Sequence, residues 1–93
     1  MANGGEPYRI EVTPAAMRDL RALAKTSRDT LVRVDATTQS LSVDPRPPGV
    51  KKLSGSSGYR VRVGEYRIIY AIDDQSRLVT IAWVRDRRDV YRP

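Results

Sequence analysis

The chain has 93 residues, 30% of them charged and 40% hydrophobic, with a formal net charge of +6 and neither Cys nor His. A chain of this length forms one domain with a modest core, and the missing residue types exclude disulfides, thiolate or imidazole metal sites and histidine proton transfer. We expect no metal and no cofactor. The apolar runs are short and the opening stretch, MANGGEP, has no basic or apolar segment, so we also expect a cytoplasmic protein without a signal peptide or membrane contact.

The positive charge is concentrated in the second half of the chain. Residues 1–45 carry six basic and six acidic side chains, whereas residues 46–93 carry eleven basic and five acidic ones. Such an imbalance favours a polyanionic partner, because cations that contact phosphates release condensed counterions and attract the ligand from a distance. An arginine-rich surface without a ligand is the alternative that composition leaves open.

The first predicted elements are a strand and a helix, after a flexible leader at residues 1–6 that precedes a single domain at residues 7–93. Residues 8–13, YRIEVT, alternate apolar and polar side chains, which is typical of a half-buried strand. Thr13 and Pro14 then form a helix start, with Thr13 as the N-cap. The helix is predicted to bury an apolar stripe of four residues: Met17, Leu20, Leu23 and Ala24.

A second helix is predicted from a cap at Ser27 to about Ser42, so that the two helices form a hairpin. DPRPPGV, residues 44–50, ends it, because its three prolines remove hydrogen-bond donors and favour extended or turn geometry. The segment KKL at residues 51–53 is a candidate edge strand, and SGSSG at residues 54–58 is a turn.

Three further strands are predicted in the second half, at Tyr59–Val63, Tyr66–Ile72 and Leu78–Val84. The last two are apolar at nearly every position, which places them at the centre of the sheet. The whole predicts an α+β fold of the order β-α-α-β-β-β, in which an N-terminal strand and a two-helix hairpin precede a twisted antiparallel sheet. The helix hairpin covers one face of this sheet and leaves the other face open.

Arginines are predicted to line the open face. In YRVRV, residues 59–63, the valines and the arginines point to opposite faces, so Arg60 and Arg62 face away from the helices if the valines face them. The two-residue turn that follows brings Arg67 of the next strand beside them. Like charges this close repel each other, whereas a bound phosphate offsets the repulsion through charge-assisted hydrogen bonds. The cluster therefore indicates a phosphate site.

A second basic group follows the last predicted strand. The segment VRDRRDVY places a tyrosine among arginines, an arrangement that suits a base stacked above a phosphate backbone. The candidates are Arg85, Arg87, Arg88 and Tyr91, of which Arg87 and Arg88 can alternatively pair with Asp86 and Asp89.

Several stretches of the chain together resemble one protein family. They are YRIEVTPAAMRDLRAL at the start, PPGVKKLSG in the middle, and then YRVRVGEYRIIYAIDD and VRDRRDVYR, in this order and at this spacing. They are similar to the RelE/ParE toxin superfamily, and specifically to the RelE-like mRNA interferase toxins of type II toxin–antitoxin systems, over nearly the whole chain. The resemblance implies a RelE-like fold of the same element order.

The resemblance also implies a toxin that acts as a metal-independent endoribonuclease, cleaves messenger RNA in the ribosomal A site and is inhibited by a cognate antitoxin. The basic open face suits an acidic antitoxin that folds on binding, and we expect operator DNA to be contacted only through that antitoxin. By position, the implied catalytic residues are Arg62, Arg67, Arg85 and Tyr91, and the implied RNA-binding residues are Lys51, Lys52, Arg60, Arg87 and Arg88.

The implied reaction is attack of a ribose 2′-hydroxyl on the adjacent phosphate. In it Arg67 clamps the scissile phosphate, and Arg85 stabilises the transition-state charge or assists the leaving group. A guanidinium with a pKa above about 12 is a poor base, so Tyr91, or else Lys51 or Lys52, is the candidate for proton removal.

Two departures from the family pattern keep alternatives open. Arg60 and Arg62 stand where some relatives carry Lys, and Asp86 stands where many carry His. These departures favour weak intrinsic cleavage or a strong dependence on ribosomal groups. The alternatives are a ParE-like toxin that poisons DNA gyrase and a catalytically weak RNA-binding relative. The conjunction of YRVRVGEYRIIY with the terminal RDVY favours the RNA-cleaving branch.

Overall fold

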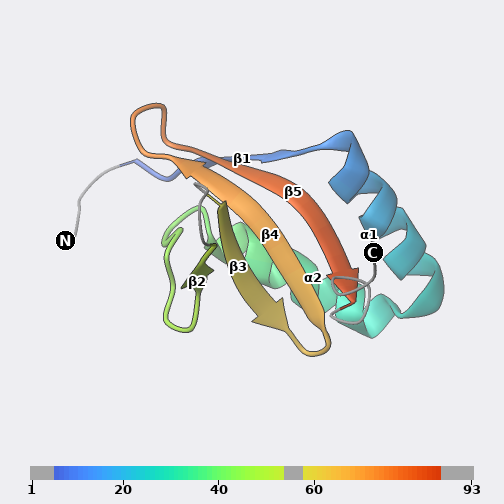
Figure 1. Ribbon diagram of the computed structural model, residues 1–93. Coiled ribbons are helices and arrows are strands. Elements are labelled where there is room, and N and C mark those ends of the chain that lie inside the picture. The colour runs from blue at the N-terminus through green and yellow to red at the C-terminus, as the bar shows by residue number, and fades with distance from the viewer. Residues whose placement is uncertain (1–5, 54–57, 87–93) are drawn as a thin grey trace.

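The computed structural model describes residues 6–53 and 58–86, and within these ranges the chain forms two helices and one five-stranded sheet (Figure 1). The strands lie in the order β1-β5-β4-β3-β2. In Figure 1, α2 passes behind β3 and β4, and α1 lies beside β5. Along the chain the elements are β1 (Arg9–Val12), α1 (Pro14–Thr26), α2 (Arg28–Ser40), β2 (Lys51–Lys52), β3 (Gly58–Val63), β4 (Tyr66–Asp73) and β5 (Leu78–Asp86).

The predicted α+β order is confirmed, with one strand pairing that the sequence analysis did not predict. Neighbouring strands from β2 to β5 pair antiparallel, and the short lysine edge strand is present. β1, however, runs parallel to β5, from Arg9 opposite Leu78 to Val12 opposite Ile81. The sheet is therefore mixed, and its first and last strands in the sequence are neighbours.

Short polar side chains set the helix boundaries. The Thr13 hydroxyl accepts a hydrogen bond from the Ala16 backbone N–H at 3.1 Å, and Pro14 occupies the first turn, where no N–H is needed. The extended backbone of Ser27 ends α1, and its hydroxyl accepts a hydrogen bond from the Thr30 N–H to begin α2. Both predicted caps are therefore confirmed.

The buried side of α1 is rotated relative to the predicted stripe. Ala16 and Leu23 are buried and Leu20 is half-buried, whereas Met17 and Ala24 are exposed. The reason is that α1 packs between β5 and α2, so the row spaced by three and four residues from Ala16 faces the protein. The prediction that Met17 and Ala24 are buried is wrong.

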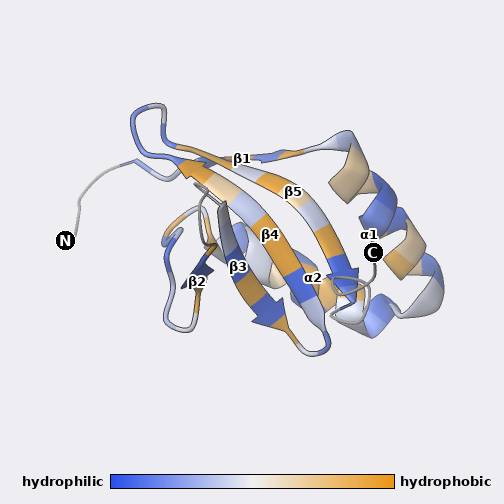
Figure 2. Cartoon of the chain, in the orientation of Figure 1, coloured by the Kyte–Doolittle hydropathy of each residue, from blue (hydrophilic) through white to orange (hydrophobic). Residues whose placement is uncertain are grey.

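The core lies between the two helices and one face of the sheet. Figure 2 shows apolar residues concentrated along β3, β4 and β5, with polar residues at the turns. Neither described helix is long and apolar enough to cross a membrane. The buried cluster comprises Ala16, Leu23, Val34, Leu41, Val61, Val63, Ile68, Tyr70, Val79, Ile81 and Val84.

The turn between β3 and β4 depends on a glycine. Gly64 has φ +59°, a conformation that glycine adopts without steric cost and that is typical of the first position of a type II′ hairpin turn. A Cβ atom at this position would lie 2.8 Å from Nη2 of Arg33, so the α2 side chain packs closely on the turn. The turn fixes the register that pairs Arg62 with Arg67.

Candidate nucleic-acid interface

Three arginines lie side by side on the open face of the sheet. Arg62 of β3 is opposite Arg67 of β4, and Arg67 is opposite Arg85 of β5. Directly opposite residues in antiparallel strands have Cα atoms about 4.5–5.5 Å apart and side chains on the same face. The structure thus brings together three of the predicted catalytic residues, which we call the arginine row.

The outward direction of Arg85 requires a break in the alternation of β5. Val79 and Ile81 point into the core, and regular alternation would direct the side chains at positions 83 and 85 there as well. Val84 lies in the core instead, with 3% of its surface exposed. The phase of the strand therefore reverses between Ile81 and Val84.

The reversal is produced by a β-bulge at Ala82. Tyr70 of β4 is opposite Ile81, whereas the preceding Ile69 is opposite Trp83, so Ala82 is an extra residue in the register. Because of this extra residue, the side chains in the remainder of β5 exchange faces of the sheet. The exchange moves the strand's arginine to the open face, where it completes the arginine row.

The three members of the arginine row differ in burial. Arg67 is only 4% exposed, Arg62 is exposed, and the Arg85 side chain is 44% exposed. The Arg85 guanidinium lies 4.8 Å from the centroid of the Trp83 ring, a cation–π contact, and its Nε is 3.5 Å from a carboxylate oxygen of Asp19 on α1. The row thus has a buried centre and two more accessible ends.

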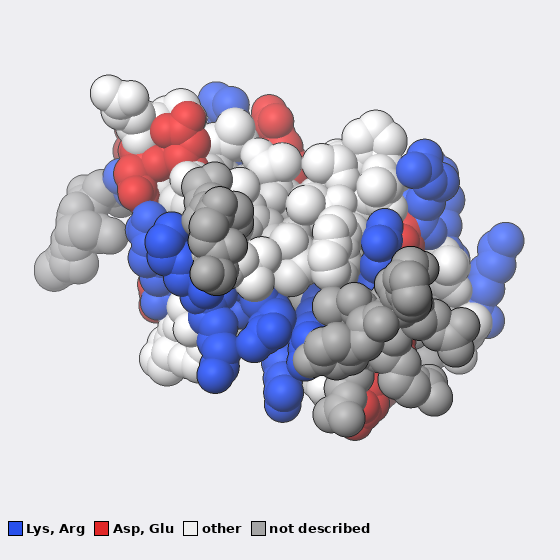
Figure 3. All heavy atoms as spheres, in the orientation of Figure 1, with Lys and Arg blue, Asp and Glu red and all other residues white. Residues whose placement is uncertain are grey.

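A basic hollow adjoins the arginine row at the β2 edge. Lys51 of β2 is opposite Arg60 of β3, so both point to the open face. Together with Gly49 and Arg62 they line a hollow of about 260 Å³. Figure 3 shows Lys and Arg side chains gathered over β2 and β3, with acidic side chains near the β4–β5 turn. The positive potential of this part of the face attracts anions.

Lys52 lies on the other face of the same edge strand. It is opposite Tyr59, which packs against the core, and its ammonium nitrogen lies 5.2 Å from the centroid of the Tyr59 ring. The alternation of β2 therefore separates the two lysines that the sequence analysis grouped together. Of this pair, Lys51 is the one that lines the basic hollow.

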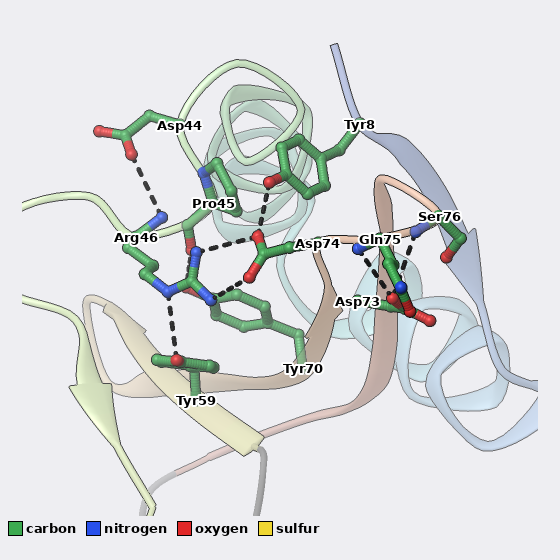
Figure 4. Close-up of polar contacts among 10 residues, drawn as sticks. All are labelled: Tyr8, Asp44, Pro45, Arg46, Tyr59, Tyr70, Asp73, Asp74, Gln75 and Ser76. Atoms are coloured by element: carbon green, nitrogen blue, oxygen red, sulfur yellow. Dashed lines mark hydrogen bonds and ion pairs between the residues drawn. The ribbon is translucent and has the colours of Figure 1, made fainter. Parts of the chain in front are cut away.

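Polar side chains hold the loop that leads from α2 to the basic hollow (Figure 4). Arg46 donates hydrogen bonds to both carboxylate oxygens of Asp74, at 3.2 and 2.9 Å, and through Nε to the Tyr59 hydroxyl at 3.1 Å. The Tyr8 hydroxyl donates to Asp74 at 2.6 Å. These four residues, which we call the polar clamp, join this loop to β3, to the β4–β5 turn and to the residue before β1.

The polar clamp stabilises the charged forms of Asp74 and Arg46 and the neutral form of Tyr8. Hydrogen bonds from Arg46 and then from Tyr8 lower the pKa of Asp74 to about 2, and the hydrogen bonds to Asp74 raise the pKa of Arg46 and of Tyr8. Close by, burial raises the pKa of Tyr70 to about 12, and its hydroxyl donates to the Pro45 carbonyl at 2.7 Å. None of these shifts brings a group to titrate near neutral pH, so the polar clamp is a scaffold and not a proton-transfer site.

Three predicted site residues, Arg87, Arg88 and Tyr91, lie outside the described residues, as does most of the predicted turn, at residues 54–57. Within residues 6–53 and 58–86, the acidic side chains form no group that could hold a metal ion. What the described face offers chemically is positive charge at defined positions. Such charge binds phosphates and stabilises the negative charge that develops when they react.

Sequence reasoning did not identify the acidic residues that support this face. Asp19 accepts a hydrogen bond from a residue 65 positions away, and Asp74 accepts two from a residue 28 positions away. No local spacing signals such contacts, since helical and strand periodicity describe neighbours along the chain. The sequence also shows no sign of the bulge at Ala82. The run around it is apolar at nearly every position, so a reversal of faces there does not change the pattern of polar and apolar residues.

Comparison with known sequences identifies a family that matches most of the chain. A family model described as the ParE toxin of the type II toxin–antitoxin system, parDE, matches residues 10–91. The toxin RelG of Mycobacterium tuberculosis is 35% identical over 89 residues, which make up 92% of this chain and 98% of that protein.

Solved structures include chains of similar fold. The toxin–antitoxin complex RelBE2 from Mycobacterium tuberculosis contains a chain with a TM-score of 0.73 and 31% identity, over 86% of this chain and 98% of that one. The archaeal RelE–RelB complex from Pyrococcus horikoshii OT3 contains a chain with a TM-score of 0.76 and 25% identity, over 87% of this chain and 96% of that one. Both similar chains were solved with a protein partner.

Proposed function

This chain belongs to the ParE toxin family of type II toxin–antitoxin systems, within the RelE/ParE superfamily, and from that premise we propose that it is an endoribonuclease that cleaves messenger RNA. Cleavage takes place in the ribosomal A site, uses no metal ion and is inhibited by a cognate antitoxin. The observation that carries the proposal is the arginine row on the open face of the sheet.

The arginine row suits phosphate chemistry with an internal nucleophile. In the proposed reaction the ribose 2′-oxygen attacks the adjacent phosphorus and the bond to the 5′-oxygen breaks, which leaves a 2′,3′-cyclic phosphate and a 5′-hydroxyl. Arg67, at the buried centre of the row, clamps the scissile phosphate. Arg85 stabilises the charge on the leaving oxygen, and the exposed Arg62 holds the neighbouring backbone.

Proton removal from the 2′-hydroxyl needs a group other than arginine, because a guanidinium stays protonated at neutral pH. We assign it to Tyr91, which stands among arginines in the sequence, because a cation beside a phenol lowers its pKa. Lys51 is the alternative, because it points to the open face beside Arg60. Lys52 is not favoured for this role, since it is paired with Tyr59 on the other face.

The proposed protein partner is an acidic antitoxin. The formal net charge of +6 and the basic hollow beside the arginine row favour such a partner through long-range attraction. The similar Mycobacterium tuberculosis chain was solved in a toxin–antitoxin complex, which supports the same arrangement here. Messenger RNA and the ribosome are the proposed targets, and operator DNA is contacted only through the antitoxin.

A second candidate function is binding to DNA gyrase without cleavage of RNA. The description of the matching family model, which names the ParE toxin, favours it. A gyrase-binding toxin does not need three arginines aligned across three strands with the middle one buried. The arginine row therefore favours RNA cleavage over gyrase binding.

Cleavage on ribosomes programmed with a defined message tests the proposal. Arg85→Ala removes one charge-stabilising donor and should lower the cleavage rate about 100-fold, the order of loss seen for one such donor. Tyr91→Phe should also slow cleavage if the phenol removes the proton. Arg9→Ala is the matched control and should cleave like the wild type, because the Arg9 side chain is 69% exposed on β1, away from the arginine row.

Primer extension should place the wild-type cuts inside the A-site codon. The proposal is overturned if the wild-type protein leaves the bound message intact and instead inhibits DNA supercoiling by gyrase. An Arg85→Ala variant that cleaves as fast as the wild type would reject the role of Arg85 alone.

A further inference from the structure

We propose that Asp19 on α1 is a positioning residue that holds the Arg85 guanidinium in the arginine row. The inference rests on the proposed function, because it assigns a role to a residue outside the arginine row in the same reaction.

The second half of β5 extends beyond its neighbour β1. The register between the two strands ends where Val12 is opposite Ile81, so the edge from Ala82 onward has no strand beside it on that side within the described residues. α1 supplies the missing partners. The Thr13 hydroxyl donates to the Ala82 carbonyl at 2.7 Å, and Asp19 Oδ2 accepts a hydrogen bond from the backbone N–H of β5 at residue 84, at 2.9 Å.

Asp19 thus secures the strand segment that follows the Ala82 bulge. This is the segment whose direction decides which face Arg85 occupies. The carboxylate is mostly removed from water, with 20% of its side chain exposed, and a partly buried acceptor interacts more strongly than an exposed one. The backbone hydrogen bond is the first of two contacts that Asp19 makes.

The second contact goes to Arg85 itself. The same carboxylate oxygen, Oδ2, lies 3.5 Å from Arg85 Nε, and the Trp83 ring lies against the guanidinium with its centroid 4.8 Å away. The carboxylate contact uses Nε, and the central guanidinium carbon lies over the Trp83 ring. The terminal nitrogens Nη1 and Nη2 are therefore left for the paired hydrogen bonds that a phosphate accepts.

The structure has space into which the Arg85 side chain could turn if its contact with Asp19 is lost. Asp19 and Arg85 both line a hollow of about 400 Å³ between α1 and the end of β5, together with Leu23, Thr26 and Tyr66. Repulsion from the neighbouring Arg67 would drive the Arg85 side chain away from the row. The Asp19 carboxylate opposes this repulsion and keeps the cation where the reaction needs it.

Asp19→Asn separates the two contacts. The Asn side-chain oxygen can still accept the backbone hydrogen bond from β5, but the charge that attracts Arg85 is gone. We expect the single-turnover cleavage rate on saturating programmed ribosomes to fall about 10-fold, as expected for a misplaced catalytic group, with the half-saturating concentration unchanged within about two-fold. Asp29→Asn is the matched control, because Asp29 pairs with Arg33 on the exposed side of α2, and it should cleave like the wild type.

A double-mutant cycle tests whether Asp19 acts through Arg85. In an Arg85→Ala background, Asp19→Asn should cause no further loss of rate, because the group that it positions is already absent. An equal fold-loss in both backgrounds would overturn the proposal and would indicate a purely structural role for Asp19.

A measurement that does not use activity keeps this inference distinct from the proposed function. In the wild-type protein the Arg85 Nε proton should exchange slowly with water, as followed by ¹⁵N-edited NMR, and in Asp19→Asn its exchange should become at least several-fold faster. Unchanged exchange would overturn the positioning role even if the enzyme cleaves RNA. Faster exchange in a protein that does not cleave RNA would retain the contact and reject the proposed function.

Discussion

The two faces of the central sheet are built from alternate residues of the same strands and differ in charge and in what covers them. Along β3, Val61 and Val63 are buried in the core, whereas Arg60 and Arg62 line the basic hollow on the opposite face. On β4 the fully buried Ile68 follows directly after an arginine. One face is an apolar layer under two helices, and the other carries fixed positive charge.

This difference indicates that stability and activity depend on different residues of the same strand. Burial of apolar side chains supplies most of the driving force for folding, and it requires only the helix-covered face. The arginines of the open face add mutual repulsion to the folded state, which folding alone does not require. Substitutions one residue apart should therefore affect different measurements.

The largest expected effect on stability comes from the helix-covered face. Ile68→Ala should lower the free energy of unfolding by about 2–5 kcal/mol, because the side chain is completely buried and its loss leaves a cavity. Urea denaturation followed by circular dichroism measures the change. A loss below about 1 kcal/mol would contradict this contrast between the two faces, because it would mean that the helix-covered face is not tightly packed.

A smaller effect, of a different kind, is expected from the open face. Arg62→Ala should change the free energy of unfolding by no more than about 0.5 kcal/mol, because the residue is exposed. It should weaken binding of a single-stranded RNA whose 2′-hydroxyls are methylated, and it should reduce the slope of log affinity against log salt by about 0.7, the value for one lost phosphate contact. Binding titrations at several salt concentrations measure the slope, with Arg9→Ala as the control. A slope equal to that of the wild type would argue against a phosphate contact at Arg62.

The smallest effect is expected from the polar clamp, which anchors the loop that leads to Lys51. The pKa of Asp74 is lowered to about 2 in the folded protein, from an ordinary value near 3.8. Its contribution to stability is therefore present above about pH 4 and is lost as the pH falls toward 2. The difference in melting temperature between the wild type and Asp74→Asn should shrink over this range, whereas the difference for the exposed Asp35→Asn should not follow the same curve. If this difference in melting temperature does not change with pH, the polar clamp stabilises the loop through the shape of its contacts and not through the charge of Asp74.

Much of the fold could be predicted from local patterns in the sequence. Thr13 and Ser27 cap helices because their side chains satisfy N–H groups that have no partner in the helix. Alternation in β3 predicted that Arg60 and Arg62 share a face, and the two-residue turn at Gly64 predicted that Arg67 joins them. The similarity of the chain to the RelE/ParE superfamily, predicted from ordered stretches of sequence, is also confirmed.

The rest depends on contacts between distant parts of the chain. The parallel pairing of β1 with β5 joins segments about 70 positions apart, and no local signal distinguishes parallel from antiparallel pairing there. Lys52 was grouped with Lys51 because a two-residue strand is too short to show alternation. The arginine row was only partly predicted, because the bulge that brings Arg85 into it lies in an unbroken apolar run.

The extra residue at Ala82 makes the length of β5 as important as its composition. Deleting or inserting a single residue between the β4–β5 turn and Arg85 would exchange the faces of Val84 and Arg85, which would send a cation among apolar side chains and a valine into water. Substitutions in this stretch that conserve side-chain volume and polarity can accumulate one at a time, each with a modest cost. Changes in length cannot, so we expect β5 to tolerate drift in its residues and to resist insertions and deletions.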